Sequence, residues 1–245
     1  MNSEMPRIAI PEPNSTQPDY NQRSWPQYAR AVTIAGGIAV PVPLTESPAS
    51  VAKLVASCSG VLLPGSPADV NPQKYGQEPV PECAAADPAR EAVDELLLQD
   101  AFNLHKPLLC ICYGTQSLNV WKGGTLQQHL TTELNHKAGR EVVEAHPVTI
   151  AADAQHFTDF PPSLPVNSSH HQSVALPGDG LYIIATAPDG TVEAIEQRGE
   201  QFVLGVQWHP ERTFDLDSHS RSIFTAFVRA AQDWKPREIR ESIAR

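Results

Sequence analysis

The chain has 245 residues, with 18 Lys and Arg against 28 Asp and Glu, which gives a formal net charge of −10. Its content of 41% apolar and 19% charged residues is typical of a globular protein and excludes a disordered chain. The negative charge argues against nucleic acid and anionic membranes as partners, and no apolar stretch approaches the roughly 18 residues of a membrane-spanning helix. Because residues 1–7 lack the basic flank and apolar core of a signal peptide, we expect a cytoplasmic protein.

The first half of the chain alternates apolar runs with segments of helical period. Strands are predicted at residues 7–10, 38–42, 60–63 and 108–111, and helices at 25–35, at 51–56 and in a segment that begins at Asp87. Asp87 suits the N-cap of this third helix, and Pro88 suits its first turn. This alternation predicts a largely parallel sheet with helices on both faces.

Beyond about residue 140 the pattern changes to strands separated by short turns. These strands are predicted at residues 142–150, 181–187, 191–195 and 202–207. Pro188-Asp189-Gly190 is a turn signal, so an antiparallel hairpin is expected around it. Residues 223–231 are predicted to form a closing helix, and residues 233–245 a solvated C-terminal helix. With no convincing linker, a single domain over residues 1–245 is expected.

The cysteines and histidines do not form a metal-binding pattern in the sequence. The four cysteines, of which Cys110 and Cys112 are the closest pair, are too few and too widely spaced for a disulfide scaffold. No second Cys pair or closely spaced His pair follows at the spacing of a zinc site. His170 and His171 are adjacent, and neighbouring residues of a strand point to opposite faces. We therefore expect no metal site and no cofactor.

Cys112 lies where a buried strand is predicted to turn into a helix. Such a side chain is pushed out at the carboxyl end of the sheet, where the first N–H groups of the helix face it. The helix N-terminus is expected to lower the pKa of the thiol, and the N–H of Tyr113 is placed to face an oxyanion. Gly114 allows the helix to start close to the strand. The alternative is a buried cysteine at an ordinary strand end.

A thiol nucleophile needs a base, and the base needs an orienting partner. His209 follows the predicted strand 202–207, and Glu211 lies two residues further on, within reach of the second imidazole nitrogen. Pro210 restricts the backbone between them. A His-x-Glu sequence alone is more often a surface pair, but its position after a buried strand favours a catalytic pair.

These residues carry a resemblance to a known family. Cys112-Tyr-Gly-Thr-Gln116 with the distant His209-Pro-Glu211 resembles the class I glutamine amidotransferase fold and its Cys-His-Glu triad. Further segments resemble the γ-glutamyl-γ-aminobutyrate hydrolase family in the same order along the chain, at residues 62–76, 119–128, 166–174 and 188–195. The resemblance runs from about Ile8 to Phe227. It implies a mostly parallel, helix-covered α/β sheet of flavodoxin-like type with an added antiparallel hairpin region.

The resemblance also implies roles for the matching positions. Cys112 would be the nucleophile, His209 the acid and base, and Glu211 its orienting group. The backbone N–H groups of Gly65 and Tyr113 would bind the oxyanion, each contributing about 3 kcal/mol. The residues expected to border the γ-glutamyl pocket are Gln116, Ser169, His170, His171 and Gln172.

Three departures from the family pattern leave the choice of substrate open. Cys110 stands two positions before the nucleophile, where the family usually has glycine, and its thiol is expected to pack beneath the turn. Tyr113 replaces an arginine that is frequent in the close hydrolases. Pro64-Gly65-Ser66 replaces a more glycine-rich run.

The expected function is cysteine-dependent hydrolysis of a small γ-glutamyl amide through a γ-glutamyl thioester, in polyamine catabolism. One alternative is a glutaminase subunit that delivers ammonia to a synthetase partner; another is a catalytically silent binding protein on the same fold. The sequence does not identify the leaving amine. It also leaves the oligomeric state open, a homodimer included.

Overall fold

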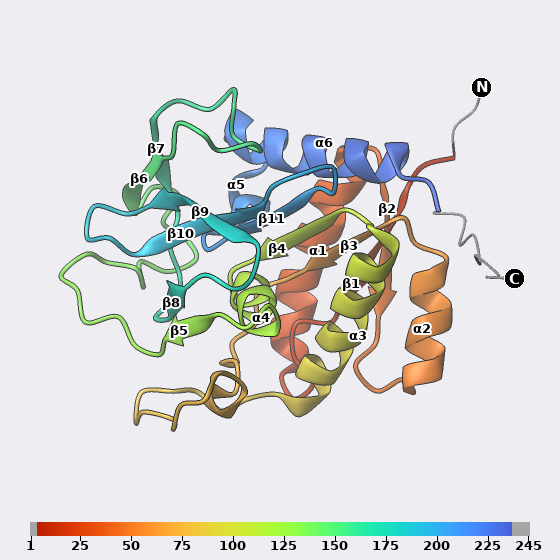
Figure 1. Cartoon of the computed structure of the whole chain (residues 1–245), viewed down its shortest axis with the longest axis horizontal. Coiled ribbons are helices and arrows are strands. Elements are labelled where there is room, and N and C mark those ends of the chain that lie inside the picture. The colour runs from red at the N-terminus through yellow and green to blue at the C-terminus, as the bar shows by residue number, and fades with distance from the viewer. Residues whose placement is uncertain (1–3, 237–245) are drawn as a thin grey trace, which may run out of the picture.

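The computed structural model describes residues 4–236. Nine strands form one sheet in the order β2-β1-β3-β4-β11-β10-β9-β6-β7, and β5 and β8 form a second, two-stranded sheet (Figure 1). The strands are β1 (Arg7–Pro11), β2 (Ile38–Val42), β3 (Gly60–Leu63), β4 (Leu108–Ile111), β5 (Thr125–Gln127), β6 (His146–Ile150), β7 (Ser163–Val166), β8 (Ser173–Leu176), β9 (Leu181–Thr186), β10 (Val192–Gln197) and β11 (Val203–Val206). The helices are α1 (Pro18–Ile34), α2 (Pro48–Ala56), α3 (Pro88–Leu104), α4 (Tyr113–Trp121), α5 (Pro210–Thr213) and α6 (Ser218–Asp233), with a 3₁₀ turn at Pro72–Tyr75.

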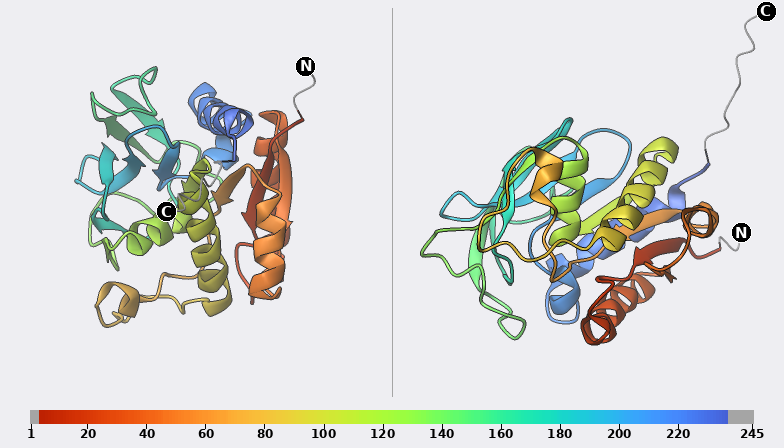
Figure 2. Two further views of the ribbon diagram at one scale, coloured as in Figure 1. Left: turned by 45° about the vertical axis from the view of Figure 1, so that its right-hand side comes forward. Right: turned by 90° about the horizontal axis from the view of Figure 1, so that it is seen from below.

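The central strands of the large sheet are parallel. β1 pairs with β2 and β3, β4 joins β3, and β11 joins β4, all in parallel register. Every residue of β3, β4 and β11 is buried, as is typical of strands covered on both faces. In the right-hand view of Figure 2, α1 and α6 lie on one side of the sheet, and α3 and α4 lie on the other. The predicted α/β fold with a helix-covered sheet is confirmed.

Antiparallel strands extend this sheet beyond β11. β10 pairs with both β11 and β9, and β6 pairs with both β9 and β7, so the antiparallel region contains more than the predicted hairpin. The predicted strand 142–150 begins only at His146. Val143 and its neighbour Val142 are instead exposed, because their apolar run lies outside the sheet. The short strands β5, β7 and β8 were not predicted.

Helix boundaries differ most at α1. This helix begins at Pro18 and carries Pro26 in its interior, whereas the sequence predicted a start at Trp25. A proline normally marks the first turn of a helix, so Pro26 obscured the true beginning. At α3 the predicted cap is present, since the Asp87 carboxylate accepts a hydrogen bond from the backbone N–H of Arg90 at 3.2 Å. Of the helix predicted at 233–245, Asp233 ends α6, and residues 237–245 lie outside the described residues.

The carboxyl ends of β3, β4 and β11 meet at one edge of the sheet because these strands are adjacent and parallel. Gly65, Cys112 and His209 each follow one of these strands within three residues. The topology therefore gathers at one edge three residues that are far apart in the sequence. In the part of the chain that the structure describes, no helix combines the length and the apolar character that crossing a membrane requires.

Candidate active site

Cys112 occupies a strained turn between β4 and α4. Its φ of 53° and ψ of −108° place it outside the usual regions for a residue with a side chain. Its N–H donates to the carbonyl of Val206 at 2.8 Å, and its own carbonyl accepts from the N–H groups of Thr115 and Gln116. Such a conformation costs about 1–3 kcal/mol and persists only where the surroundings enforce it. The sheet and the helix together hold this side chain at the end of β4.

Gly114 allows α4 to start against β3. A Cβ atom at this position would lie 2.3 Å from the carbonyl oxygen of Leu63, which is closer than any contact that real Cβ atoms make. Only glycine therefore fits there without moving the helix or the strand.

His209 and Glu211 form a buried pair after β11. The Nδ1 atom of His209 lies 2.7 Å from Oε1 of Glu211, and both side chains are almost fully buried. Asn167 fixes the backbone of this histidine, because its side chain accepts from the His209 N–H at 2.9 Å and donates to the His209 carbonyl at 2.8 Å. Since the carboxylate accepts a hydrogen bond from the protonated Nδ1, the Nε2 atom is left to exchange protons with a neighbour. Asn167 lies in the segment 166–174 that carries the family resemblance, but it was not among the predicted site residues.

Gly65 lies beside both Cys112 and His209. A Cβ atom at Gly65 would be 2.9 Å from Cε1 of His209 and 3.5 Å from Cβ of Cys112. The structure therefore brings the three predicted positions into one place. The Gly65 N–H donates to the hydroxyl of Tyr28 at 3.1 Å, and this tyrosine from α1 is buried. Tyr28 lies in a helix whose start was mispredicted, and no motif in the sequence pointed to it.

Burial controls the protonation of the cysteine and histidine. It raises the pKa of the Cys112 thiol to about 12; nearby Arg212 and the Tyr113 N–H oppose the rise, whereas Glu211 adds to it. The expectation of a lowered thiol pKa is thus wrong, because desolvation outweighs the helix N-terminus. Burial and Arg212 also lower the pKa of His209 to about 4, although Glu211 opposes this. The resting pair is consequently a neutral thiol and a neutral imidazole.

Glu211 remains ionised next to this neutral histidine. Burial raises the pKa of its carboxyl group, but the electrostatic interaction and the hydrogen bond with the His209 imidazole outweigh that effect and lower it overall. Arg212 contributes in the same direction, with its Nε atom 3.5 Å from Oε1 of Glu211. An ionised carboxylate on Nδ1 stabilises any positive charge that the imidazole acquires.

Arg90 supports the loop that carries Gly65 and the neighbouring loop after β1. This fully buried side chain donates to the carbonyls of Pro64 at 2.6 Å and Pro13 at 2.8 Å, and it pairs with Asp94 at 2.7 Å. Its guanidinium also lies 4.8 Å from the ring centroid of Tyr113. The sequence predicted only the start of the helix in which Arg90 lies. Its role as a support is visible only when the loops after β1 and β3 are placed around it.

The residues predicted to border the substrate pocket divide into separate groups. The Gln116 amide donates to the carbonyl of Gln172 at 3.1 Å and to Oε1 of Gln207 at 3.2 Å, so Gln116 and Gln172 adjoin each other. His171 instead lies 3.1 Å from the Asp69 carboxylate in the loop after β3. Ser169 is partly exposed, and within the described residues its hydroxyl makes no hydrogen bond.

His170 turns away from His171 and packs against Glu193 of β10. The two adjacent histidines therefore face different partners, and they lie in a loop after β7 and not in a strand as expected. His170 is close enough to His209 to contribute to the lowering of its pKa.

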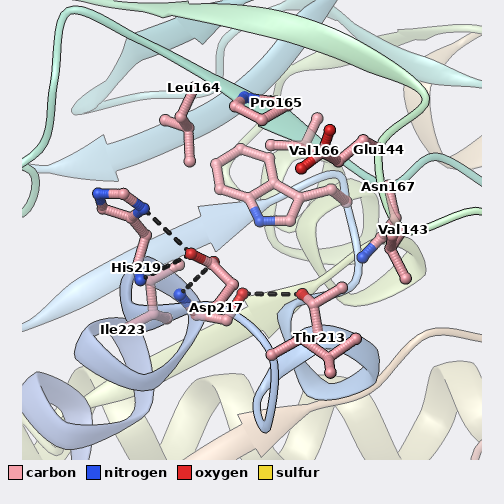
Figure 3. Close-up of a pocket in the computed structure, with 13 residues that line it drawn as sticks. Val143, Glu144, Leu164, Pro165, Val166, Asn167, Thr213, Asp217, His219 and Ile223 are labelled. Carbon is pink, nitrogen blue, oxygen red and sulfur yellow. Dashed lines mark hydrogen bonds and ion pairs between the residues drawn. The ribbon is translucent and has the colours of Figure 1, made fainter.

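A surface pocket of about 250 Å³ lies between β7 and α6 (Figure 3). It is lined by Leu164, Asn167, Trp208 and Ile223, among others, and Asp217 caps α6 at its floor. Neither Cys112 nor His209 lines this pocket. Asn167 and Trp208 connect its wall to the segment that carries His209.

Comparison with known proteins identifies relatives along most of the chain. The sequence pattern described as Peptidase C26 matches residues 9–211. A Mycobacterium tuberculosis protein named "Putative glutamine amidotransferase Rv2859c" is 39% identical over 86% of this chain and 68% of its own. A γ-glutamyl-γ-aminobutyrate hydrolase of Escherichia coli O157:H7 is 34% identical over 84% of this chain and 85% of its own. Among solved structures, a glutamine amidotransferase of Thermotoga maritima superimposes with a TM-score of 0.58 at 15% identity, covering 93% of this chain and 96% of that one.

Proposed function

The chain belongs to the Peptidase C26 family and is a glutamine amidotransferase-like hydrolase, and we propose that it hydrolyses small γ-glutamyl amides with Cys112 as nucleophile. The observation that carries this proposal is the meeting of Cys112, His209 and Gly65 at the ends of three adjacent strands. A nucleophile, an oriented base and a backbone N–H donor in one place are the parts that acyl transfer requires.

The first half-reaction forms a γ-glutamyl thioester. The Cys112 thiol transfers its proton to Nε2 of His209 as its sulfur attacks the γ-carbonyl carbon, so charge separates only when substrate is present. Glu211 stabilises the imidazolium through Nδ1. His209 then gives the proton to the departing amine as the C–N bond breaks. In the second half-reaction, water loses a proton to His209 and attacks the thioester, releasing glutamate and restoring the thiol.

The backbone N–H groups of Gly65 and Tyr113 would stabilise the oxyanion of each tetrahedral intermediate. In the resting structure the Gly65 N–H donates to the Tyr28 hydroxyl, so an oxyanion that takes over this hydrogen bond would lie beside that hydroxyl. A tyrosine hydroxyl can accept one hydrogen bond and donate another. Tyr28 is therefore placed to act as a third donor to the oxyanion.

A panel of γ-glutamyl amides that differ in their leaving amine tests the proposal. The panel should contain γ-glutamyl-γ-aminobutyrate, other γ-glutamyl amides and glutamine, compared as kcat/KM with the purified chain alone. We expect γ-glutamyl-γ-aminobutyrate or a similar amide to be cleaved better than glutamine. A marked preference for glutamine would instead support an ammonia-delivering glutaminase.

Replacement of the nucleophile tests the chemistry itself. Cys112→Ala should reduce turnover at least about 1000-fold with an unchanged fold, because no other group can form the thioester. Cys58→Ala is the matched control, since Cys58 is also a buried free thiol but lies at the end of α2. Full activity in Cys112→Ala would contradict the mechanism. If the wild-type protein hydrolyses none of the amides in the panel, the result would support a binding protein without catalytic activity.

A further inference from the structure

Three histidines and a glutamate meet in the antiparallel part of the molecule, where the proposed reaction does not use them. His136 lies in the segment between β5 and β6, His146 begins β6, His170 follows β7, and Glu193 belongs to β10. One donor atom from each of them lies within 4.8 Å of all the others. No side chain of the four is more than 2% exposed.

The spacing of these atoms matches ligands around one ion better than hydrogen bonds. Oε1 of Glu193 lies 3.2 Å from Nδ1 of His136, 3.4 Å from Nε2 of His170 and 3.6 Å from Nε2 of His146. Two ligands bound to a tetrahedral zinc ion at about 2.0–2.1 Å are about 3.3 Å apart. None of the three nitrogens, nor either carboxylate oxygen, makes a hydrogen bond of acceptable geometry.

The second nitrogen of each imidazole shows which atom faces the centre. Nδ1 of His170 lies 2.9 Å from the carbonyl of Gln172, and Nδ1 of His146 lies 3.2 Å from the carbonyl of Pro147. Nε2 of His136 lies 3.0 Å from the Asp189 carboxylate. Because a carbonyl or carboxylate oxygen only accepts, each of these nitrogens carries the proton, as in the outer contacts of metal-bound histidines.

Three imidazole lone pairs and one carboxylate consequently face one another without a donor between them. In the part of the chain that the structure describes, Glu193 has only histidines as ion-pair partners. A buried carboxylate without compensating positive charge is strongly unfavourable. A cation at the centre would satisfy all four groups at once.

We propose that His136, His146, His170 and Glu193 bind one divalent transition-metal ion, Zn²⁺ in the first place, in a closed four-coordinate site. Imidazole and carboxylate ligands suit zinc, and four protein ligands leave no open position for a reacting water. The ion would therefore be structural. It would fasten the segment 128–145 and the segment 167–172 to β10.

This site would affect the proposed catalytic residues only by holding in place the segment that contacts them. His170 lies in the same segment as Asn167, which fixes the His209 backbone, and its Nδ1 contacts the Gln172 carbonyl that also accepts from Gln116. A cavity of about 290 Å³, lined by His136, His170 and residues of the segment 130–137, adjoins two of the four ligands and would offer a path for the ion.

Metal content is the direct test and does not depend on activity. The full chain, purified without chelator, should contain about one zinc ion per molecule, measured by inductively coupled plasma mass spectrometry. After removal of the metal by a chelator, it should rebind about one ion on dialysis against micromolar Zn²⁺. Co²⁺ should bind in its place and produce the visible absorption bands of a tetrahedral complex. The catalytically inactive Cys112→Ala variant should bind zinc as tightly as the wild type, which separates this test from the proposed function.

Variants distinguish this site from adventitious binding. Glu193→Gln and His146→Gln should each weaken zinc binding at least tenfold, and Asp189→Asn, which leaves all four ligands in place, should weaken it about 10–100-fold. His219→Gln is the matched control, because it removes a histidine outside the cluster. The proposal fails if the wild type binds no ion after dialysis, or if Asp189→Asn and Glu193→Gln bind zinc as tightly as the wild type. In that case protonated histidines, and not a metal ion, would neutralise the Glu193 carboxylate.

Discussion

Cys112 and His209 are both neutral at pH 7, because each side chain is buried among groups that disfavour its charged form. A neutral pair transfers its proton only when the attacked carbonyl can take up the negative charge. The base must be unprotonated before the reaction, so the pKa of His209 sets the acidic limit of activity.

We expect kcat/KM for a γ-glutamyl amide to stay nearly constant from pH 8 down to about pH 5. It should fall only as the pH approaches the His209 pKa of about 4, whereas an exposed histidine would cause a fall near 6.5. A pH–rate profile measures this, with thermal unfolding recorded at each pH to exclude acid denaturation. A midpoint at pH 6–7 would contradict the buried neutral base.

The same histidine makes the fold sensitive to acid. Because the pKa of His209 is lower in the folded than in the unfolded protein, its contribution to the free energy of unfolding is fully present above the unfolded pKa of 6.5. This contribution is lost as the pH falls toward about 4. The loss should reach about 3 kcal/mol over that range. Urea unfolding of the wild type and of His209→Gln at several pH values should show a smaller dependence in the variant. If the free energy of unfolding depends on pH equally in both proteins, groups other than His209 cause the acid sensitivity.

Tyr28 provides a prediction about the oxyanion. Tyr28→Phe should lower kcat about tenfold with little change in KM, since the hydroxyl would act only when the oxyanion forms. Tyr182→Phe is the control, because that hydroxyl belongs to an exposed residue of β9. An unchanged kcat in Tyr28→Phe would restrict the oxyanion donors to Gly65 and Tyr113.

At the scale of elements, the N-terminal end of α3 is connected to the loops after β1 and β3 through Arg90. A guanidinium can donate in several fixed directions at once, which lysine cannot reproduce. The loop that carries Gly65 is thereby attached to a helix rather than left to its own contacts.

Arg90→Met should lower the free energy of unfolding by about 3–5 kcal/mol, because it leaves Asp94 buried and unpaired. The double variant Arg90→Met/Asp94→Leu should recover much of the stability, since no buried charge remains. Its kcat should stay low, because the Pro64 carbonyl has lost its donor. Chemical denaturation and steady-state kinetics of both variants separate these effects. A double variant with full activity would show that Arg90 acts on stability alone.

Elements with a strong local signal were predictable from the sequence. The strands that became β3 and β4 are continuous apolar runs, and Asp87-Pro88 marks the start of α3. Pro26 concealed the start of α1, and the short strands β5 and β8 lack a clear period. The positions of Cys112 and His209 were predictable because each follows a buried strand. Tyr28, Asn167 and Arg90 were not, since their roles arise from contacts between distant segments.

At the scale of the whole molecule, the parallel and antiparallel halves of the sheet contribute different parts to the site. Cys112 and Gly65 belong to the parallel half, whereas Asn167 and the histidine cluster belong to the antiparallel half. The boundary between the halves is β11, which leads directly to His209. The base therefore depends on the alignment of one half against the other.

Zinc removal should affect these halves unequally. Chelation should increase amide hydrogen exchange in the segments 128–146 and 167–172, while strands β1, β3 and β4 keep their protection. At free zinc about a thousandfold above the dissociation constant, the ion should stabilise the fold by about 4 kcal/mol. Hydrogen-exchange mass spectrometry with and without chelator measures the local effect. A uniform increase in hydrogen exchange along the chain would argue against a metal ion that stabilises only these segments.

The buried Cys112 thiol has a consequence for survival under oxidative stress. Peroxides and general alkylating reagents react with thiolates, and a thiol whose pKa is raised to about 12 supplies almost none at neutral pH. A sulfur that becomes nucleophilic only when a fitting carbonyl arrives is shielded from such damage between turnovers. Durability and selectivity would then have one origin, the apolar surroundings at the end of β4.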